Sequence, residues 1–592
     1  MKKILNILVK LFMLLTLINS CSKDFLDKQP LDQYGGQAVW NDLQLMETFT
    51  NNIYAGIYHG FEGKIGMQML CDEAMRVADR GAVNVTNSLV SPSDYSVFNS
   101  QVGQMKLRWE NIYINIRACN LFLSQAEKNT YSDQAFKNRL VGEVHFLRAY
   151  YYHTLAFMYG GVPIIKNPYS LNDDPLIARN TFEETIKFII EECDSAANNL
   201  PIKHADAQNG RATKGAALAL KSRILLYAAS DLYNNSSWTA GYSNPELVGY
   251  VEGDRQSRWL AAKNAAKAVM DLNVYNLYKG DPAPGDDIVK NYTDIFLLKQ
   301  TSEDIFVRFF TQNSMQTTEI YHPGLHNMPG GYHAHGSNNP IGESVDDYEM
   351  NDGTKFDWSN PVHKASPYQN REPRLYANIL YDGAQWRQRP ADVVPLDPLG
   401  IIQTGFYENA DGTWRGGLDT RNSPIEDWNN TGSGYYQRKC IDPSYVFQYQ
   451  VQESPWRFIR YTEILLNYAE ACNELNEDPE ATKYIDLIRK RAGLPGMTTT
   501  GSALRESIRH ERRIELMFEG QRYFDIRRWM IAPQVMGQNA TGVDIRYKSG
   551  QSKPVYSVIK IQNRSWKDRS YFMPIKLDEM NKNKLLIQNP LY

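Results

Sequence analysis

Long amphipathic helices that follow one another in pairs set the strongest limit on how this chain folds. Apolar residues recur at three- and four-residue spacing in the segments 40–58, 133–159, 181–198, 213–232, 258–271, 456–475, 479–492 and 504–518. Thr181 and Glu184 have the spacing of a capping box, and Gly160 marks a helix end. Helices of this length joined by short turns favour stacked hairpins. The sequence therefore predicts an all-α fold of tetratricopeptide-like hairpins.

The segment 275–450 departs from this pattern. It is rich in Gly, Pro, Asn, Tyr and Trp, it has few helical periods, and it contains a β-like run at 304–310. Long structured loops on a rigid scaffold usually carry function, so we expect this insertion to form the ligand face. Four tryptophans in it are stacking candidates: Trp358, Trp386, Trp414 and Trp428. Four others fall in helical patterns and are expected in the core: Trp40, Trp109, Trp456 and Trp529.

The first twenty residues have the features of a targeting segment. Lys2 and Lys3 precede an apolar stretch, 4–18, that is short for a membrane span. Residues 18–21 (INSC) fit a lipobox loosely, because Asn19 is atypical there. We predict a lipoprotein signal peptide over 1–20 and lipidation of Cys21, followed by a tether over 21–39. An ordinary signal peptide that happens to contain a cysteine is the alternative.

Charge and cysteine content exclude several functions. The formal charge of −3 becomes −6 once Lys2, Lys3 and Lys10 are removed, and a mildly acidic chain does not favour nucleic-acid binding. Five cysteines remain after Cys21, widely spaced and without a CxxC pair. Those in helical patterns are expected to be buried thiols. No other stretch is long and apolar enough to cross a bilayer.

The segment 508–529 concentrates acidic and basic residues. One interpretation is a set of catalytic acids and bases. Charged side chains on partly buried helices must be paired, however, so we favour an internal ion-pair network. The residues concerned are Glu511, Arg512, Glu515, Arg522, Asp525 and Arg528. Nucleophile elbows, phosphate-binding loops, dinucleotide fingerprints and zincin motifs are absent from the sequence, which predicts no cofactor and no enzyme activity.

A loop at 322–335 holds four of the ten histidines. Zinc binding is one interpretation, but the helical HExxH spacing is absent and no Cys or carboxylate lies at a plausible ligand offset nearer than Glu343. We therefore predict no metal and favour polar contacts with a ligand, with an ordinary surface loop as the alternative. A glycosidase needs two carboxyl groups facing each other across a cleft, and nothing in the sequence points to such a pair.

Many segments, in order along nearly the whole chain, resemble the SusD/RagB family of outer-membrane nutrient-binding lipoproteins of Bacteroidetes. They are 21–30, WENIYINIRACNL (109–121), RAY (148–150), YGGVPI (159–164), RATKGAA (211–217), DYEMNDG (347–353), NREPRL (370–375), RYTEILLNYAEA (460–471), IRHERRIEL (508–516), EGQRYFDIRRW (519–529), MPI (573–575) and QNP (588–590).

This resemblance implies a function. It implies a lipid-anchored protein on the surface of the outer membrane that captures oligosaccharides and delivers them to a SusC-like TonB-dependent transporter. It implies binding without catalysis. Capture of peptides or glycopeptides by the same mechanism is the alternative. It also implies an N-terminal helical region over 40–274, the loop-rich ligand face over 275–450 and a C-terminal helical region over 451–592, in one compact unit.

Two stretches are the expected ligand site. The first is 72–98 and the second is 322–335; two tryptophans of the insertion are added as stacking residues. The predicted ligand-binding residues are Asp72, Arg80, Tyr95, Phe98, Tyr332, His333, His335, Trp386 and Trp414.

Overall fold

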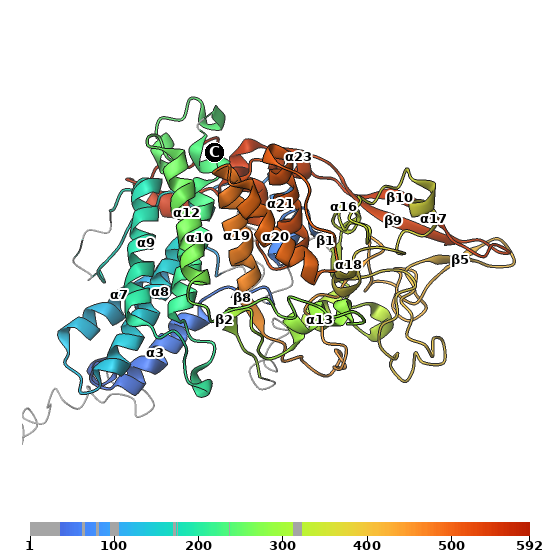
Figure 1. Cartoon of the computed structure of the whole chain (residues 1–592), viewed down its shortest axis with the longest axis horizontal. Helices are drawn as coiled ribbons and strands as arrows, with labels where there is room; N and C mark the ends of the chain where they lie inside the picture. Colours follow the sequence, from blue (N-terminus) through green and yellow to red (C-terminus); the bar gives the residue numbers. More distant parts are fainter. Residues whose placement is uncertain are drawn as a thin grey trace, which may run out of the picture.

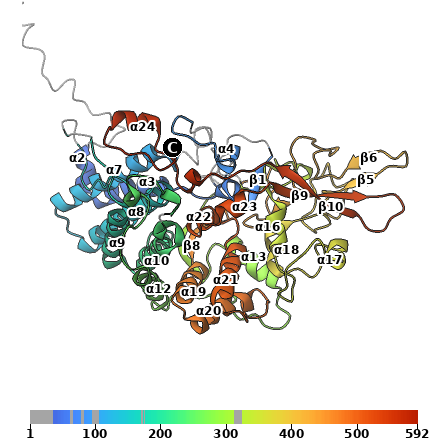
Figure 2. The ribbon, with the colours of Figure 1, turned by 90° about the horizontal axis from the view of Figure 1, so that it is seen from above.

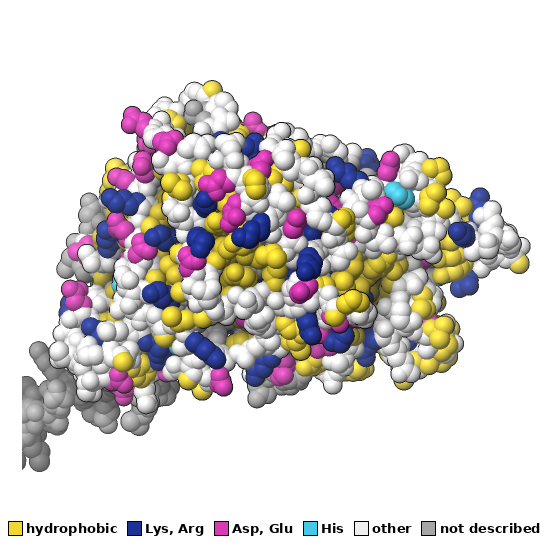
Figure 3. Space-filling view, in the orientation of Figure 1, with side chains coloured by type: hydrophobic (Ala, Val, Ile, Leu, Met, Phe, Trp, Pro, Cys, Tyr) yellow, Lys and Arg dark blue, Asp and Glu magenta, His cyan; other side chains and the backbone are white. Residues whose placement is uncertain are grey.

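The protein is elongated, with a stack of helices at one end and a loop-rich part with a projecting hairpin at the other (Figures 1 and 2). The computed structural model describes residues 36–61, 66–77, 82–94, 106–169, 173, 176–235, 237–311 and 323–592. Cys21, Arg80, Tyr95 and Phe98 lie outside the described residues. Hydrophobic side chains cross the middle of one face, where the stack meets the loop-rich part (Figure 3).

The helical stack is continuous. Its members are α3 (Leu43–Ala55), α7 (Trp109–Lys128), α8 (Gln134–Tyr159), α9 (Phe182–Asn199), α10 (Lys214–Ala229), α12 (Arg255–Met270), α19 (Tyr461–Glu474), α20 (Asp478–Arg491) and α21 (Gly501–Glu515). From α7 onward each helix packs on the next, and α12 joins the N-terminal helices to α19. The two halves of the chain therefore share one stack.

Local sequence explains the ends of these helices. The Glu184 amide donates to Thr181 Oγ1 at 3.1 Å, and the Thr181 amide donates to Glu184 Oε2 at 3.0 Å, so the predicted capping box is confirmed. α8 ends at Gly160, whose positive φ of 84° suits glycine. In α10, small side chains let the neighbouring helices approach, because Ala216, Ala217 and Ala219 are fully buried.

Short helices connect these elements. They are α2 (Gly36–Asn41), α4 (Ala82–Thr86), α11 (Asp231–Asn234), α13 (Ile288–Leu297), α15 (Pro323–Asn327), α16 (Gly342–Asp346), α17 (Pro361–Ala365), α18 (Pro373–Asn378), α22 (Arg522–Arg528), α23 (Ala532–Met536) and α24 (Leu577–Lys582).

Strands form three small pairs and one sheet. The antiparallel pairs are β1 (Ala74–Arg76) with β3 (Asn338–Pro340), β2 (Asp304–Arg308) with β8 (Trp456–Arg460), and β4 (Ile379–Leu380) with β7 (Tyr436–Gln437). The sheet has the order β10 (Val555–Gln562), β9 (Ala540–Tyr547), β5 (Phe406–Glu408), β6 (Trp414–Gly416), with β5 parallel to β9. β9 and β10 form the projecting hairpin (Figure 2).

The fold is largely helical, as predicted, but it is not all-α. The predicted helix over 456–475 begins only at Tyr461, because residues 456–460 form β8. The hairpin over 540–562 lies within the expected C-terminal helical region and was not predicted. The β-like run at 304–310 is confirmed as β2, and all four tryptophans expected in the core are buried. Among the described residues, no helix combines the length and apolar composition needed to span a bilayer.

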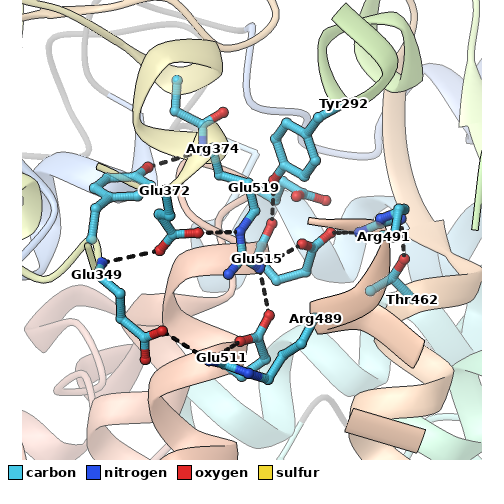
Figure 4. Close-up of polar contacts among 12 residues, drawn as sticks. Tyr292, Glu349, Glu372, Arg374, Thr462, Arg489, Arg491, Glu511, Glu515 and Glu519 are labelled. Atoms are coloured by element: carbon cyan, nitrogen blue, oxygen red, sulfur yellow. Dashed lines mark hydrogen bonds and ion pairs between the residues drawn. The ribbon is translucent and has the colours of Figure 1, made fainter. Parts of the chain in front are cut away.

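A network of buried ion pairs lies where α20 and α21 meet the loop-rich part (Figure 4). Glu511 accepts from Arg374 at 2.5 Å and from Arg489 at 3.1 Å. Glu515 accepts from Arg374 at 3.0 Å and pairs with Arg491 and Arg460. The predicted ion-pair role of the segment 508–529 is thus confirmed.

Residues 571–592 return to the N-terminal helices. The Met573 amide donates to the carbonyl of Met158, and the Asn589 amide group donates to that of Tyr159. Arg179 donates to the carbonyl of Ile587 at 2.7 Å. The end of α8 is therefore closed by a segment about four hundred positions away.

Candidate functional site

β1 and β3 bring the two predicted ligand stretches together. Met75 lies opposite Asn339, and the Val77 amide donates to the carbonyl of Ser337 at 3.1 Å. The Ile341 amide donates to the carbonyl of Glu73 at 3.2 Å. The stretch after Asp72 and the histidine-rich loop before β3 therefore lie side by side.

A small polar pocket, here called the seam pocket, lies beside this strand pair. Its lining includes Gly60, Phe61, Gly66, Gln68, Pro323, His326, Asn327, Asn338, Gln437, Trp456 and Phe518. The volume of about 20 Å³ is room for roughly one water-sized group. The pocket therefore fits a single hydroxyl group rather than a sugar ring.

Three amide oxygens in the seam pocket have no hydrogen-bond partner among the described residues. Asn327 Oδ1, Asn338 Oδ1 and Gln437 Oε1 are buried, and none accepts a hydrogen bond from the described residues. Buried polar atoms in folded proteins are nearly always paired, because an unpaired one costs about 1–3 kcal/mol. The pocket is therefore prepared for a group that donates hydrogen bonds.

Aromatic rings form one wall of the seam pocket. Phe61 meets Trp456 edge to face at 5.1 Å, and Phe310 lies 5.7 Å from Phe61. A Cβ on Gly60 would lie 2.0 Å from the Trp456 ring, so only glycine permits this close approach. The chain thus places flat apolar surface next to hydrogen-bond acceptors.

An inner chamber of about 80 Å³ adjoins the seam pocket and shares Gly60, Gln68 and Trp456 with it. His153 lines it at 5% exposure, and neither of its ring nitrogens bonds to a described residue. Burial, and then the charge of Arg223, hold the pKa of His153 well below its usual range. A neutral imidazole offers one donor and one acceptor.

Arg223 adds no free charge to the inner chamber. Glu463 binds its guanidinium through both carboxylate oxygens, at 2.7 and 2.6 Å. Tyr227, in the same lining, donates to Gln521 at 2.7 Å. The charge of Arg223 is therefore compensated in the chamber wall, and the polar groups beside it suit uncharged hydroxyl groups.

Asp72 lies below β1 as part of the scaffold. It is 3% exposed, and its carboxylate accepts from Arg522 at 2.9 and 2.7 Å and also pairs with Arg513. Burial alone would raise the pKa of Asp72, but these two guanidinium groups hold it well below its usual range. Burial, and then the charge of Asp72, raise the pKa of the neighbouring Glu73 to about 8. The ion pairs, rather than a ligand, account for the charge of Asp72.

The histidine-rich loop is held by contacts of its own. Tyr332 is 4% exposed, and its hydroxyl donates to the carbonyl of Arg387 at 2.9 Å. His333 contacts Asp392 at 2.9 Å, and His335 lies 5.5 Å from His326 between ring centres. Tyr332 is thus a core residue and offers no stacking face, while His333 and His335 remain half-buried. Within the described ranges, no three His, Cys, Asp or Glu side chains form a group suited to a metal ion.

The predicted tryptophans lie outside both cavities. Trp386 is half-buried under Arg438, and its indole N–H is buried without a partner among the described residues. Trp414 is 36% exposed and lies 5.0 Å from the Arg546 guanidinium. Trp428 is 68% exposed. Neither the seam pocket nor the inner chamber is lined by any of them.

Glu515 of the ion-pair network is not poised for proton transfer. Burial alone would raise the pKa of Glu515, but Arg491, Arg460 and Arg374 hold it well below its usual range. A carboxylate held in this way stays charged, and both of its oxygens are engaged by arginine side chains. The network therefore fixes helices in place.

Sequence reasoning predicted none of the residues lining the two cavities individually as ligand-binding, although Pro323, His326 and Asn327 fall within the predicted stretch 322–335. Nothing in the chain distinguishes Asn327, Asn338 or Gln437 from other loop amides. His153 alone carried a hint, because it interrupts an apolar run in α8 where a buried polar residue needs a partner.

Two sequence profiles match this chain. One, described as the SusD family, covers residues 302–592, and one described as "Starch-binding associating with outer membrane" covers 24–226. The SusD-like protein P38 of Formosa agariphila is 22% identical over 565 residues, which span 91% of this chain and 94% of that one.

Solved structures share the fold. A SusD-like protein from Bacteroides fragilis superposes with a TM-score of 0.75 at 28% identity, over 95% of this chain and all of that one. A SusD-like carbohydrate-binding protein from the same species has a TM-score of 0.71 at 23% identity, over 93% and 100%.

Proposed function

Because the chain belongs to the SusD family, we propose that it binds glycans without transforming them, with the seam pocket, which receives one hydroxyl group of the ligand, and the adjoining inner chamber at the core of its principal site. One observation carries this proposal: three buried amide oxygens, without partners in the part of the chain that the structure describes, line a pocket with an aromatic wall. Sugars present hydroxyl donors and apolar C–H faces, and this pair of features meets both needs.

The role that we propose for the protein in the cell is the one expected of this family. The protein captures oligosaccharides at the surface of the outer membrane, where lipidated Cys21 anchors it, and passes them to a SusC-like TonB-dependent transporter. The helical stack supplies the rigid body for this task, and its paired helices are tetratricopeptide-like. The profile description that mentions the outer membrane and the carbohydrate-binding relative support this proposal.

Glycan binding should be measurable by calorimetry with a panel of neutral oligosaccharides. We expect dissociation constants between micromolar and millimolar, about −4 to −8 kcal/mol. Gln437→Ala removes one acceptor and should weaken binding by about 0.5–1.5 kcal/mol, the net value of a hydrogen bond. Tyr95→Ala, at a predicted stacking position, should cost about 1–3 kcal/mol, by analogy with stacking of bases on aromatic rings.

Two controls accompany these variants. Gln551→Ala removes an exposed amide at the tip of the hairpin and should bind as the unaltered protein does. Trp109→Ala removes a core ring and should damage folding instead. Binding of peptides with no binding of any glycan would replace this proposal by peptide capture.

Membrane attachment tests the anchor. Cys21→Ala should move the protein from the membrane fraction to the aqueous fraction, because each buried CH₂ of an acyl chain contributes about 0.8 kcal/mol. Incorporation of labelled fatty acid, followed by fractionation, measures this. Ser22→Ala is the matched control and should fractionate normally. Unchanged fractionation of Cys21→Ala, together with an unlabelled native protein, would contradict lipidation.

A further inference from the structure

A second hollow, here called the outer groove, runs along β2. It consists of two adjoining pockets of about 360 and 330 Å³, which share Asn209, Gly210, Arg211, Val307 and Phe309. Together they reach the size of small-molecule sites, about 300–1,000 Å³. Ile57 and Phe458 line both the outer groove and the inner chamber and so stand between them.

The loop over 207–211 forms one side of the outer groove and is fixed to the body. Arg211 donates to Glu143 at 2.8 Å and to Asn51 at 2.8 Å, and the Ala212 amide donates to the Tyr54 hydroxyl at 2.9 Å. Gly210 has a φ of 94°, and a Cβ there would lie 3.1 Å from the Phe309 ring. The groove is therefore preformed rather than created by a ligand.

The charges in the outer groove are unbalanced. Arg211 is neutralised by Glu143 and Glu47, and Asp304 by Arg457. The remaining charged residues of the lining, Arg308 in one pocket and Lys203 in the other, have no ion-pair partner within the described ranges. The groove thus presents two positive charges, one in each half.

Partly exposed rings and amides line the same groove. Tyr54, Phe309 and Tyr275 are half-buried and offer apolar surface, and Gln208 and Asn209 offer amide groups. Rings and amides fit the C–H faces and hydroxyls of sugars, while the two cations require anionic groups. The combination differs from the compensated charges of the inner chamber.

We propose that the outer groove binds an acidic oligosaccharide, with anionic groups of different sugar units paired to Arg308 and Lys203. The proposal rests on glycan binding as the function of the protein and adds a second site with its own substrate class. Carboxylates of uronic acids and sulfate esters share the required chemistry. A ligand with a repeating charge matches two cations placed in adjoining pockets.

Calorimetry with tetragalacturonate, a sulfated galactan tetrasaccharide and neutral maltotetraose tests this. We expect at least one acidic ligand to bind more tightly than maltotetraose and to weaken as NaCl is raised from 20 to 300 mM, because salt screens exposed charges. Arg308→Gln and Lys203→Gln should each weaken binding of that ligand about tenfold. Comparing the carboxylated with the sulfated ligand shows whether the groove prefers uronic acids or sulfate esters.

Controls separate this proposal from the principal site. Lys299→Gln, an exposed neighbour outside the lining, should bind as the unaltered protein does, and melting temperatures check folding. If the acidic ligands bind no more tightly than maltotetraose, the proposal for the outer groove is wrong, while the proposal of glycan binding stands. The groove proposal is also overturned if Arg308→Gln and Lys203→Gln still bind the acidic ligand while Gln437→Ala does not. A polyglutamate peptide that binds as tightly as the acidic oligosaccharide overturns it as well. Failure of every glycan overturns both proposals.

Discussion

Glu515→Ala is expected to lower the free energy of unfolding by about 3–5 kcal/mol, the usual cost of removing one partner from a buried ion pair. The substitution leaves Arg491, Arg460 and Arg374 with one carboxylate fewer in a region without solvent. Urea unfolding followed by tryptophan fluorescence measures the change.

Glu506→Ala is the matched control for Glu515→Ala. Both residues are glutamates in α21, but the Glu506 side chain is mostly exposed and its pair with Arg509 spans 3.2 Å at the surface. Exposed pairs contribute about 0–1 kcal/mol. Equal destabilisation by the two variants would mean that the network does not hold the helices.

Asp72→Asn should destabilise the protein by a similar amount while leaving glycan affinity unchanged. The substitution keeps the shape of the side chain but removes the negative charge that Arg513 and Arg522 share. Thermal unfolding and calorimetry on the same preparation measure the two properties separately. Asp578→Asn, at an exposed pair with Lys576, is the control and should change neither.

The opposite outcome for Asp72→Asn is equally informative. Lost glycan binding with unchanged stability would restore the ligand role that the sequence predicted for Asp72. The ion pairs would then be incidental to stability.

Local features explain why most helices were predictable. The capping box of Thr181 and Glu184 and the stop at Gly160 depend on residues a few positions apart, so sequence alone locates them. β8 was not predictable in this way, because its partner β2 lies about 150 positions earlier and no local pattern indicates the pairing. Apolar spacing in 456–460 fits either a helix or a buried strand.

The candidate site was predictable as two regions but not as residues. The sequence located the stretches that β1 and β3 join. It placed Asp72 and Tyr332 at the ligand, whereas Asp72 is occupied by arginines more than 400 positions away and Tyr332 is closed in by loop carbonyls. In the irregular insertion no periodicity separates a buried ring such as Tyr332 from an exposed one such as Trp428.

The return of residues 571–592 to the N-terminal helices has a consequence for biosynthesis. The Tyr159 carbonyl already accepts from Arg179, but its second donor, Asn589, and the donor to Met158 become available only after almost the whole chain has left the ribosome. Contacts between such distant positions form late, since closing long loops is entropically costly. The end of α8 therefore lacks these contacts until the last segment of the chain is available. A premature stop codon near residue 570 would remove the donors that close α8 and so affect the whole fold.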